Sequence, residues 1–368
     1  MRAHAVVVRS VAAGAQLEEI DVDPPGPGEV LVRVAASGIC GSDLHVLHGR
    51  SVIDAFPMVL GHEGSGVVEE IGPGVRSVSP GDHVVLALYG PCGECTPCRV
   101  GRFVLCDGAA RLAAIRGRMA DGSTRCHLAD GSDAYPMVGI GSLAELAVLR
   151  AEQVVVIDPT IPLELICLAG CGVTTGLGAV FNVADVRPDE TVAVVGCGGV
   201  GLNVIQGARI AGTTTIVALD PSPHRRLLAT RLGATHAFDP AGDVVSAVHG
   251  VVPGGVDVAF EAVGVPQLVA DAFAATRPGG RCVMVGSPPA GQSIPIDGRA
   301  LFGERKLLGT TGGSNVPARD IPRITRLYAD HRLDLATLVS ARRPITDFAA
   351  SIAETERGEV ARSVVLMA

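Results

Sequence analysis

The sequence lacks the features that mark membrane proteins and nucleic-acid-binding proteins. It has 368 residues, no tryptophan, only 3% aromatic residues and no long run of lysine and arginine. Its formal net charge is −8 at pH 7, so we expect no nucleic-acid partner. No stretch approaches the roughly 20 consecutive apolar residues of a membrane-spanning helix, so we expect no membrane segment either.

A signal peptide is not expected at the N-terminus. Residues 1–19 read MRAHAVVVRSVAAGAQLEE, with only a short apolar run before Arg9, which is typical of a first β-strand. We therefore expect a cytoplasmic protein whose thiols stay reduced. In that compartment, ten cysteines indicate metal binding or catalysis before disulfides.

The composition indicates a well-packed protein with more than one core. Hydrophobic residues make up 48% of the chain and charged residues 18%, which is typical of a globular protein. A chain of this length is too long for a single core, so we expect two domains. The 47 glycines indicate many tight turns and close backbone contacts.

Two regions of the chain differ in their pattern. Residues 1–172 contain short apolar strands such as EVLVRVAA and DHVVLAL, separated by glycine and proline turns, which predicts a β-rich, barrel-like domain. From about residue 191, strands such as TVAVV and TTTIVALD alternate with helical stretches, which predicts a doubly wound parallel sheet. After residue 313 the pattern returns to mixed helix and strand.

A glycine-rich loop predicts a dinucleotide site in the second region. GCGGVG follows the strand TVAVV directly and begins a helix, and Asp220 ends the next strand about 20 residues downstream. Backbone N–H groups and the helix N-terminus suit a pyrophosphate, while Asp220 would bind the adenine ribose and repel a 2′-phosphate. NAD is therefore expected over NADP, although Arg225 and Arg226 could hold a phosphate. The residues assigned to the loop are Gly196, Gly198, Gly199, Val200 and Gly201.

Four closely spaced cysteines predict a closed metal site. The segment GPCGECTPCRVGRFVLC has the spacing C-x2-C-x2-C-x7-C, which suits one tetrahedral Zn²⁺ held by four thiolates. A site with all four positions filled leaves no place for substrate, so we expect it to be structural. An iron–sulfur cluster is the less favoured occupant. Its ligands would be Cys92, Cys95, Cys98 and Cys106.

An open metal site must then be sought elsewhere. The stretches GICGSDLH, GHEGSGVV and GCGVTTG contain Cys40, His62 and Cys171, which would form a Cys₂His set with one free position. Their separation in the sequence is too long for spacing alone to prove a site. Taken singly, each also fits a buried thiol or a satisfied histidine.

Together these motifs, in this order along the whole chain, resemble the zinc-dependent alcohol dehydrogenases of the medium-chain dehydrogenase/reductase superfamily. The stretch RGRMADGSTRCHLADG resembles the longer, liver-type and class III-like form. The resemblance implies an α/β protein with a GroES-like β-rich catalytic domain and a Rossmann doubly wound parallel sheet. The first would comprise residues 1–172 and 313–368, with a structural zinc lobe at about 90–107; the second, residues 173–312, would bind NAD.

The resemblance also implies roles for individual residues. Cys40, His62 and Cys171 would ligate a catalytic zinc, so that each chain holds two Zn²⁺ ions. Around that zinc, Glu63 would help exchange its ligand, Asp43 would orient His62, and Ser42 and His45 would relay the proton. Along the cofactor, the resemblance assigns Thr175 and Val200 to the nicotinamide, Asp220 and Arg225 to the adenosine, and Arg362 to the pyrophosphate.

Two positions depart from the family pattern. Gly41 stands where many relatives carry arginine or histidine against the cofactor phosphate, so cofactor binding is expected to be weaker unless Arg362 or helix amides suffice. Leu88 stands where liver-type enzymes carry phenylalanine, so the alcohol pocket is expected to admit a bulkier substrate.

The function implied is NAD-dependent interconversion of primary or aromatic alcohols and the matching aldehydes. A thiol-dependent formaldehyde dehydrogenase is the alternative, and a basic pocket residue among Arg111, Arg116 and Arg118 would favour it. A zinc and dinucleotide binder without turnover is the third possibility. The resemblance further implies a homodimer, with a tetramer left open, and KLLGTTG as an edge strand used for subunit pairing.

Overall fold

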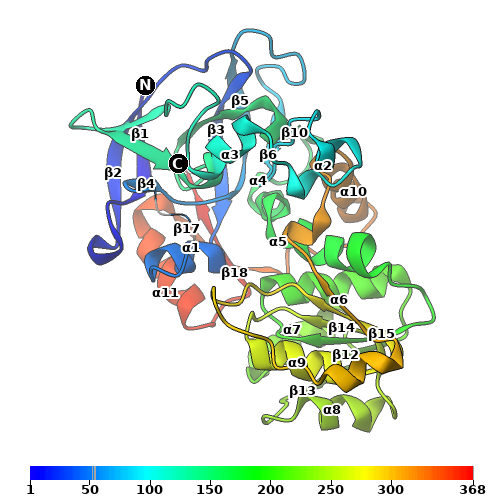
Figure 1. Ribbon diagram of the computed structural model, residues 1–368. Coiled ribbons are helices and arrows are strands. Elements are labelled where there is room, and N and C mark those ends of the chain that lie inside the picture. The colour runs from blue at the N-terminus through cyan, green and yellow to red at the C-terminus, as the bar shows by residue number, and fades with distance from the viewer. Residues whose placement is uncertain (52, 54, 368) are drawn as a thin grey trace. The chain divides into compact units, whose positions relative to one another are not determined.

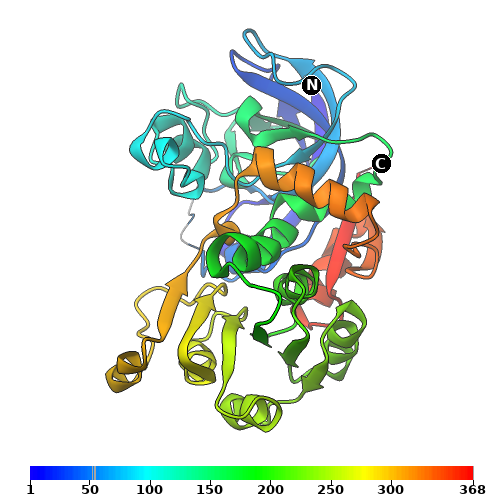
Figure 2. The same ribbon diagram turned by 90° about the vertical axis from the view of Figure 1, so that its right-hand side faces the viewer.

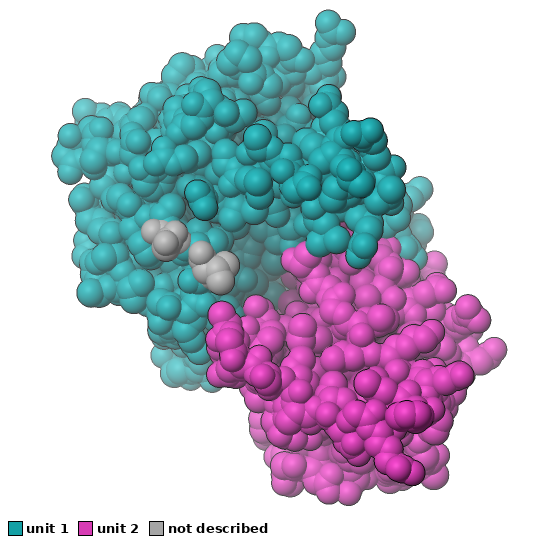
Figure 3. All heavy atoms as spheres, viewed as in Figure 1, with its two compact units in different colours: residues 1–171, 316–330, 339–368 teal, residues 172–315, 331–338 magenta. Residues whose placement is uncertain are grey.

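The computed structural model describes residues 1–51, 53 and 55–367. The chain divides into two compact units, which Figure 3 shows in different colours. Unit 1 comprises Met1–Cys171, Val316–Asp330 and Val339–Ala368, and unit 2 comprises Gly172–Asn315 and His331–Leu338.

One segment departs from the domain boundaries expected from the sequence. Residues 331–338 fall in unit 2, whereas the resemblance assigned residues 313–368 to the GroES-like domain; the other bounds differ by one residue at 172 and by three at 313. The cause is a side chain buried in unit 2. The amide of Gln206 donates to the carbonyl of Asp334 over 3.1 Å and accepts from its N–H over 2.8 Å, which holds this segment against unit 2.

Part of unit 1 is a closed barrel of short strands (Figure 1). Alternating residues of the first strand point to its interior, where Ala5 and Val7 are fully buried beside Leu128. The alternate residues Val6 and Val8 are also fully buried, in a second apolar core of unit 1, so this part of the strand is covered on both faces. In barrel order the strands are β1 (Arg2–Val8), β2 (Ala15–Val22), β7 (Cys126–Leu128), β8 (Asp133–Pro136) and β4 (Met58–Val59).

The second sheet of unit 1 brings the ends of three strands together. In it, Gly38 at the end of β3 is opposite both Glu63 at the start of β5 and Val364 in β18. Residues on either side of these strand ends therefore gather at one place. The sheet order is β10 (Val154–Val156), β6 (His83–Leu86), β5 (Glu63–Ile71), β3 (Glu29–Gly38), β18 (Arg362–Leu366) and β17 (Val339–Pro344), and β9 (Leu146–Arg150) also pairs with β3.

The helices of unit 1 are short except one. Helix α10 is 13 residues long and buries Ile321, Ile324 and Leu327, the spacing of a helix with one apolar face. The unit 1 helices are α1 (Gly41–Leu47), α2 (Thr96–Arg99), α3 (Ala109–Ile115), α4 (Leu163–Ile166), α10 (Pro317–Ala329) and α11 (Phe348–Glu356).

Unit 2 is the doubly wound parallel sheet that the sequence predicts. All its strand pairs are parallel, and helices lie on both faces of the sheet (Figures 1 and 2). The order is β13 (His236–Phe238), β12 (Thr215–Leu219), β11 (Thr191–Val195), β14 (Val256–Glu261), β15 (Thr276–Met284) and β16 (Lys306–Gly309). The helices are α5 (Gly172–Gly178), α6 (Gly199–Ala211), α7 (Pro223–Leu232), α8 (Val244–Val251) and α9 (Pro266–Ala274).

The strand order reverses between β11 and β14, since successive crossovers leave these neighbours in opposite directions. In open sheets of this kind, ligands bind at such a switch point, outside the carboxyl ends of the strands. The predicted glycine loop lies there, directly after β11.

Across the residues described, no single helix is both long and apolar enough to cross a membrane. One bent pair of helices, Leu163–Gly170 and Gly172–Ala184, is long and apolar enough to cross a membrane by length and composition alone. The buried core helices of other proteins meet the same two criteria.

Candidate metal and nucleotide sites

One cluster of metal-ligating side chains lies where the three strand ends of unit 1 meet. The ligand atoms of Cys40, His62, Glu63 and Cys171 all lie within 4.8 Å of one another. Cys40 is the N-cap residue of α1, and His62 and Glu63 stand at the start of β5. The long separations that left this set unproven in the sequence are closed by strand pairing.

Glycines make room for this cluster. A side chain at Gly38 would begin 2.5 Å from Glu63 Oε2, and one at Gly170 would begin 2.6 Å from the carbonyl oxygen of Leu86. Gly61, the residue before His62, has a φ of +93°, and a Cβ there would meet the Leu143 nitrogen at 2.4 Å. Three positions beside the ligands therefore require glycine for packing reasons.

Asp43 connects the two segments that carry the first ligands. Its carboxylate accepts the N–H of Cys40 over 2.8 Å and the N–H of Gly61 over 3.2 Å. Its Oδ1 also lies 3.4 Å from His62 Nδ1, and both side chains are almost fully buried. This geometry can hold the His62 ring with Nε2 directed to a metal.

The donor set fits Zn²⁺. His62 Nε2 is buried and has no hydrogen-bond partner in the described part of the chain, and thiols and a carboxylate surround it. A hydrogen bond from Cys171 lowers the pKa of Cys40 well below its usual value, against the effect of burial. A thiolate and an imidazole nitrogen held together in this way are the ligands that zinc prefers.

Glu63 and Arg362 form a buried pair beside the cluster. Arg362 Nε lies 3.5 Å from Glu63 Oε2, and the two side chains are 8% and 0% exposed. Burial raises the pKa of Glu63 to about 7, although the Arg362 guanidinium acts in the opposite direction. Arg362, which the resemblance assigns to the cofactor pyrophosphate, therefore lies within unit 1 beside the acidic neighbour of the zinc ligands.

Helix α1 carries the two residues of the expected proton relay. Ser42 and His45 are three residues apart, which places them on the same side of the helix. Partial burial and the nearby Arg50 cation lower the pKa of His45. Gly41, on the first turn of the same helix, has open space where a side chain would lie.

Leu88 lies next to the segment that carries the third cysteine. Its N–H donates to the carbonyl of Gly170 over 3.3 Å, and Gly170 directly precedes Cys171. The side chain of Leu88 is partly exposed. The position that the resemblance assigns to the alcohol pocket is therefore close to the open metal cluster.

The second cluster contains the four cysteines of the loop. The sulfur atoms of Cys92, Cys95, Cys98 and Cys106 lie within 4.8 Å of one another, and Cys95 Sγ is 3.8 Å from Cys106 Sγ. Tetrahedral Zn–S bonds of about 2.3 Å place sulfurs about 3.8 Å apart, so the spacing fits zinc. Backbone N–H groups, chiefly that of Cys95, lower the pKa of Cys92 to about 6.

In unit 2 the glycine loop has the form of a phosphate site. Gly196 has a φ of +91°, and a Cβ at Gly201 would lie 1.8 Å from the Gly196 carbonyl oxygen, so helix α6 can start close to the strand. Gly198 has open space around it, and α6 has no side-chain cap and no acidic residue in its first turn. Its N-terminal amides are thus suited to a pyrophosphate.

Asp220 ends β12 beside this loop. It is 2% exposed, and its carboxylate accepts the N–H of Cys197 and the N–H of Ser222, each over 2.8 Å. Arg225 Nη1 lies 3.8 Å from the same carboxylate. Arg226 instead donates to the carbonyls of Asp220 and Pro221.

Thr175 and Val200 come from two helices in close contact. A Cβ at Gly176 of α5 would begin 2.7 Å from the Val200 carbonyl oxygen of α6. Glycine at that position lets the helices approach, and it brings Thr175 near the glycine loop. The structure therefore gathers the predicted zinc residues and Arg362 in unit 1, and the remaining predicted cofactor residues in unit 2.

Comparison with known proteins decides the family. Residues 26–159 match the family model "Alcohol dehydrogenase GroES-like domain", and residues 199–330 match "Zinc-binding dehydrogenase". An NDMA-dependent alcohol dehydrogenase of Amycolatopsis methanolica is 38% identical over 372 residues, which cover 100% of this chain and 99% of the relative. The chain belongs to the zinc-dependent alcohol dehydrogenase family.

Two further relatives agree. An S-(hydroxymethyl)glutathione dehydrogenase of Saccharomyces cerevisiae is 35% identical, covering 95% of this chain and 92% of the relative. The crystal structure of benzyl alcohol dehydrogenase from Acinetobacter calcoaceticus superposes with a TM-score of 0.93 at 31% identity, covering 100% of both chains. The predicted GroES-like and Rossmann fold class is confirmed, and the protein is an oxidoreductase of the zinc-type alcohol dehydrogenases, which use a nicotinamide cofactor.

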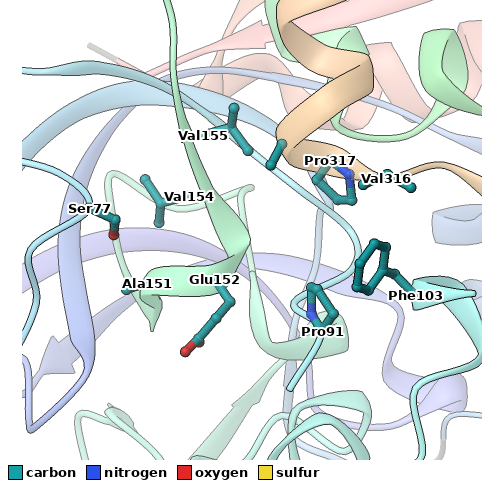
Figure 4. Close-up of a pocket in the computed structure, with 10 residues that line it drawn as sticks. Ser77, Pro91, Phe103, Ala151, Glu152, Val154, Val155, Val316 and Pro317 are labelled. Atoms are coloured by element: carbon teal, nitrogen blue, oxygen red, sulfur yellow. The ribbon is translucent and has the colours of Figure 1, made fainter. Parts of the chain in front are cut away.

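This alcohol dehydrogenase has a further pocket in unit 1, which Figure 4 shows. It measures about 450 Å³ and is mainly apolar, and Phe103, Glu152, Val154, Val316 and Pro317 are among the residues that line it. None of the predicted ligand or cofactor residues is among those that line it. It is therefore separate from the metal cluster of Cys40.

Sequence reasoning missed two kinds of residue at the alcohol dehydrogenase site. The packing glycines Gly38 and Gly170 were quoted within GICGSDLH and GCGVTTG, so their position beside the cysteines was the available signal. Arg50, which acts on His45, carried no such signal, because only the fold places it near the ring.

Proposed function

We propose that this protein is an NAD-dependent, zinc-dependent dehydrogenase that interconverts primary or aromatic alcohols and the matching aldehydes. The convergence of Cys40, His62 and Cys171 carries the proposal, since three ligands leave one position for an alcohol oxygen. The names of relatives that act on alcohols, including benzyl alcohol, support the substrate class. Two Zn²⁺ ions per chain are part of the proposal, one in each cluster.

When bound, Zn²⁺ would stabilise an alkoxide as a Lewis acid, and the nicotinamide would accept the hydride. Ser42 Oγ can accept the alcohol proton and direct it towards His45 on the same helix face. Because burial and Arg50 lower the pKa of His45, its ring is neutral at pH 7 and able to take the proton. Asp43 keeps His62 oriented, and Glu63 is placed to approach the metal.

NAD is proposed over NADP because of Asp220. Its buried carboxylate lies beside the glycine loop, where it would accept hydrogen bonds from ribose hydroxyls and repel a 2′-phosphate. Arg226 is engaged with backbone carbonyls, which leaves Arg225 as the nearby cation for the adenosine. The variant Asp220→Asn should raise the use of NADP relative to NAD, and an unchanged ratio would contradict this role.

A thiol-dependent formaldehyde dehydrogenase is the second candidate, favoured by relatives named S-(hydroxymethyl)glutathione dehydrogenase. Among the basic residues considered for it, Arg118 donates to the Gly122 carbonyl and to the Tyr135 hydroxyl, so it is occupied. Arg111 lies 5.1 Å over the Tyr89 ring, and burial lowers its pKa. Arg111 is thus the better candidate to bind the carboxylate of a thiol.

The deciding experiment is NADH formation across a substrate panel. Short primary, long-chain and benzylic alcohols would be compared with formaldehyde in the presence and absence of low-molecular-weight thiols. Turnover on alcohols alone supports the first candidate, and the alcohols that are accepted indicate the size of the pocket around Leu88. Turnover on formaldehyde only when a thiol is present supports the second. NADH binding without any turnover would indicate a zinc and dinucleotide binder.

We further propose a cytoplasmic homodimer. All ten cysteines are free, which suits a reducing compartment. Strand β16 is at the edge of the unit 2 sheet, and Leu301 and Phe302 just before it are 50% and 91% exposed. An open edge beside exposed apolar side chains suits pairing with a second copy. Light scattering on the variant Phe302→Asp should report a smaller particle than the wild type.

A further inference from the structure

A buried acid lies at the end of strand β14, at the switch point of the unit 2 sheet. Glu261 is the last residue of β14 and is 0% exposed. In the parallel register its partner on β11 is Val195, which directly precedes the glycine loop. A fully buried carboxyl group is costly unless its hydrogen bonds are made, so its position calls for an explanation.

The carboxylate of Glu261 organises the turn that follows it. Its Oε1 accepts the N–H of Val263 over 2.8 Å and the N–H of Gly264 over 2.7 Å. Helix α9 begins just after this turn, and its N-cap residue, Val265, makes no side-chain cap. Glu261 therefore supplies the acceptor for two N–H groups of the turn that leads into α9.

The turn packs directly against the glycine loop. The N–H of Ala262 donates to the carbonyl of Val195 over 2.9 Å, and a Cβ at Gly196 would lie 2.5 Å from Val263 Cγ2. On its other side, a Cβ at Gly286 would lie 2.1 Å from the Gly264 nitrogen. The turn, the glycine loop and the segment at Gly286 are thus in close contact at the carboxyl edge of the sheet. A shift of the turn would therefore displace the glycine loop.

The turn also presents apolar surface at this edge. Val263 and Val265 are 49% and 43% exposed, although large apolar side chains in unit 2 are mostly buried. Burial raises the pKa of Glu261, while the N–H groups of Gly264 and Val263 act in the opposite direction because they favour the charged form.

We propose that Glu261 is a positioning residue for the nicotinamide cofactor: it holds the turn Ala262–Val265, and the turn keeps one side of the nucleotide site in place against the glycine loop. The inference rests on the proposed dinucleotide site. Because Glu261 is fully buried and bonded to the turn, it would act through the turn and not by contact with the cofactor.

The test is the dissociation constant of NADH, measured by fluorescence titration without turnover, on the zinc-loaded protein. Glu261→Leu keeps the size of the side chain but removes both acceptors, so the constant should rise roughly tenfold, since an unsatisfied turn loses its geometry. Glu261→Gln keeps an acceptor oxygen and should bind NADH within about threefold of the wild type. Should Glu261→Leu not fold, Glu261→Ala replaces it, because it also removes the acceptor oxygens, and the same loss is expected.

A matched control exists on the same strand. Asp257, at the amino end of β14, accepts the N–H and the hydroxyl of Thr191 over 2.8 and 2.7 Å. Asp257→Leu removes these two bonds and also the ion pair with Arg277 over 2.7 Å, so it is the more severe change, at the opposite edge of the sheet. It should lower the melting temperature and leave NADH affinity within about twofold of the wild type.

Three results would overturn the inference. These are unchanged NADH affinity in Glu261→Leu, a loss in Glu261→Gln as large as in Glu261→Leu, or an equal loss of affinity in Asp257→Leu. A wild-type protein that binds no NADH would remove the proposed cofactor as well, so the two failures are distinguishable. In the supporting case, the KM for NAD rises in Glu261→Leu while the KM for alcohol does not.

Discussion

Unit 1 contains two clusters of cysteine, and they are built in different ways. The sulfurs of Cys92, Cys95, Cys98 and Cys106 come from one short loop, and backbone N–H groups support them. Cys40, His62 and Cys171 come from segments that are distant in the sequence. These segments meet where β3 ends and where β5 and β18 begin, beside buried acidic and basic side chains. The first cluster depends on local turns, and the second depends on the whole unit.

The difference indicates what each cluster can do. Four thiolates complete a tetrahedral shell, so a metal there can only hold the loop. Two thiols and one imidazole leave a position open, and Glu63 lies within reach of it. The surroundings of the second cluster support this difference. The carboxylate of Asp43 orients its histidine, and the adjoining helix α1 carries Ser42 and His45. Each prediction below removes one of these differences.

The largest effect is expected for Cys40→Ser. A hydroxyl is a poor zinc ligand, so alcohol oxidation should fall by about a thousandfold or more, the loss expected when a Lewis acid is removed. The zinc content should fall from two to one per chain, and NADH should still bind. Steady-state kinetics and metal analysis measure both.

Cys126→Ser is the matched control, since Cys126 is 3% exposed in the barrel and belongs to neither cluster. It should keep two zinc ions and nearly all of the turnover. Wild-type turnover in Cys40→Ser would remove the catalytic assignment of this cluster.

The next effect concerns stability. Cys98→Ser should release the zinc of the lobe and lower the free energy of unfolding by on the order of a few kcal/mol, because metal binding there is coupled to folding. Turnover per folded molecule should change little. The measurements are the melting temperature of each protein and its turnover at temperatures below the unfolding transition. Loss of turnover at an unchanged melting temperature would contradict a purely structural role.

The same contrast explains what could be predicted from the sequence. The lobe and the glycine loop were accessible because their residues are close together, and local turns determine their geometry. The meeting of Cys40, His62 and Cys171 was implied only by resemblance, since it depends on the pairing of Gly38 with Glu63 and with Val364.

Contacts between distant segments were out of reach for the same reason. No local pattern indicates that Arg362 lies beside Glu63, or that Gln206 holds residues 331–338 in unit 2. The pairing of Glu261 with its own turn is local, yet a lone acid after an apolar strand has no distinctive spacing. Long-range packing therefore decides the open site, whereas local sequence decides the closed one.

A smaller effect is expected for Asp43→Asn. The amide keeps one acceptor oxygen but loses the charge facing His62, so kcat/KM or zinc affinity at the open site should fall roughly 10- to 100-fold. The zinc of the lobe should stay bound under the same mild chelation. Asp82→Asn is the control, because the carboxylate of Asp82 accepts the turn N–H of Ser79 and belongs to neither cluster. Equal zinc loss from both clusters would show general destabilisation instead.

The smallest effect, and the one that depends on pH, is expected for His45→Gln. Burial and Arg50 hold the pKa of His45 below its usual value, so the neutral base form dominates at pH 7. In the wild type, alcohol oxidation should decline only as pH falls through that lowered pKa, since a protonated ring takes no proton. Glutamine does not titrate, so this inflection should disappear, with a deficit on the order of tenfold near neutral pH that shrinks as hydroxide replaces the missing base.

His48→Gln separates this role from a general effect on α1. His48 follows His45 by one turn of the chain, but its ring contacts Arg50 and Glu356 at the surface. Its variant should keep an inflection, moved slightly towards higher pH because His48 itself helps to lower the pKa of His45. An unaltered pH profile in His45→Gln would remove His45 from the relay. A profile lost only in His45→Gln would show that the open cluster works with a proton path along α1, which the four-cysteine lobe has no means to provide.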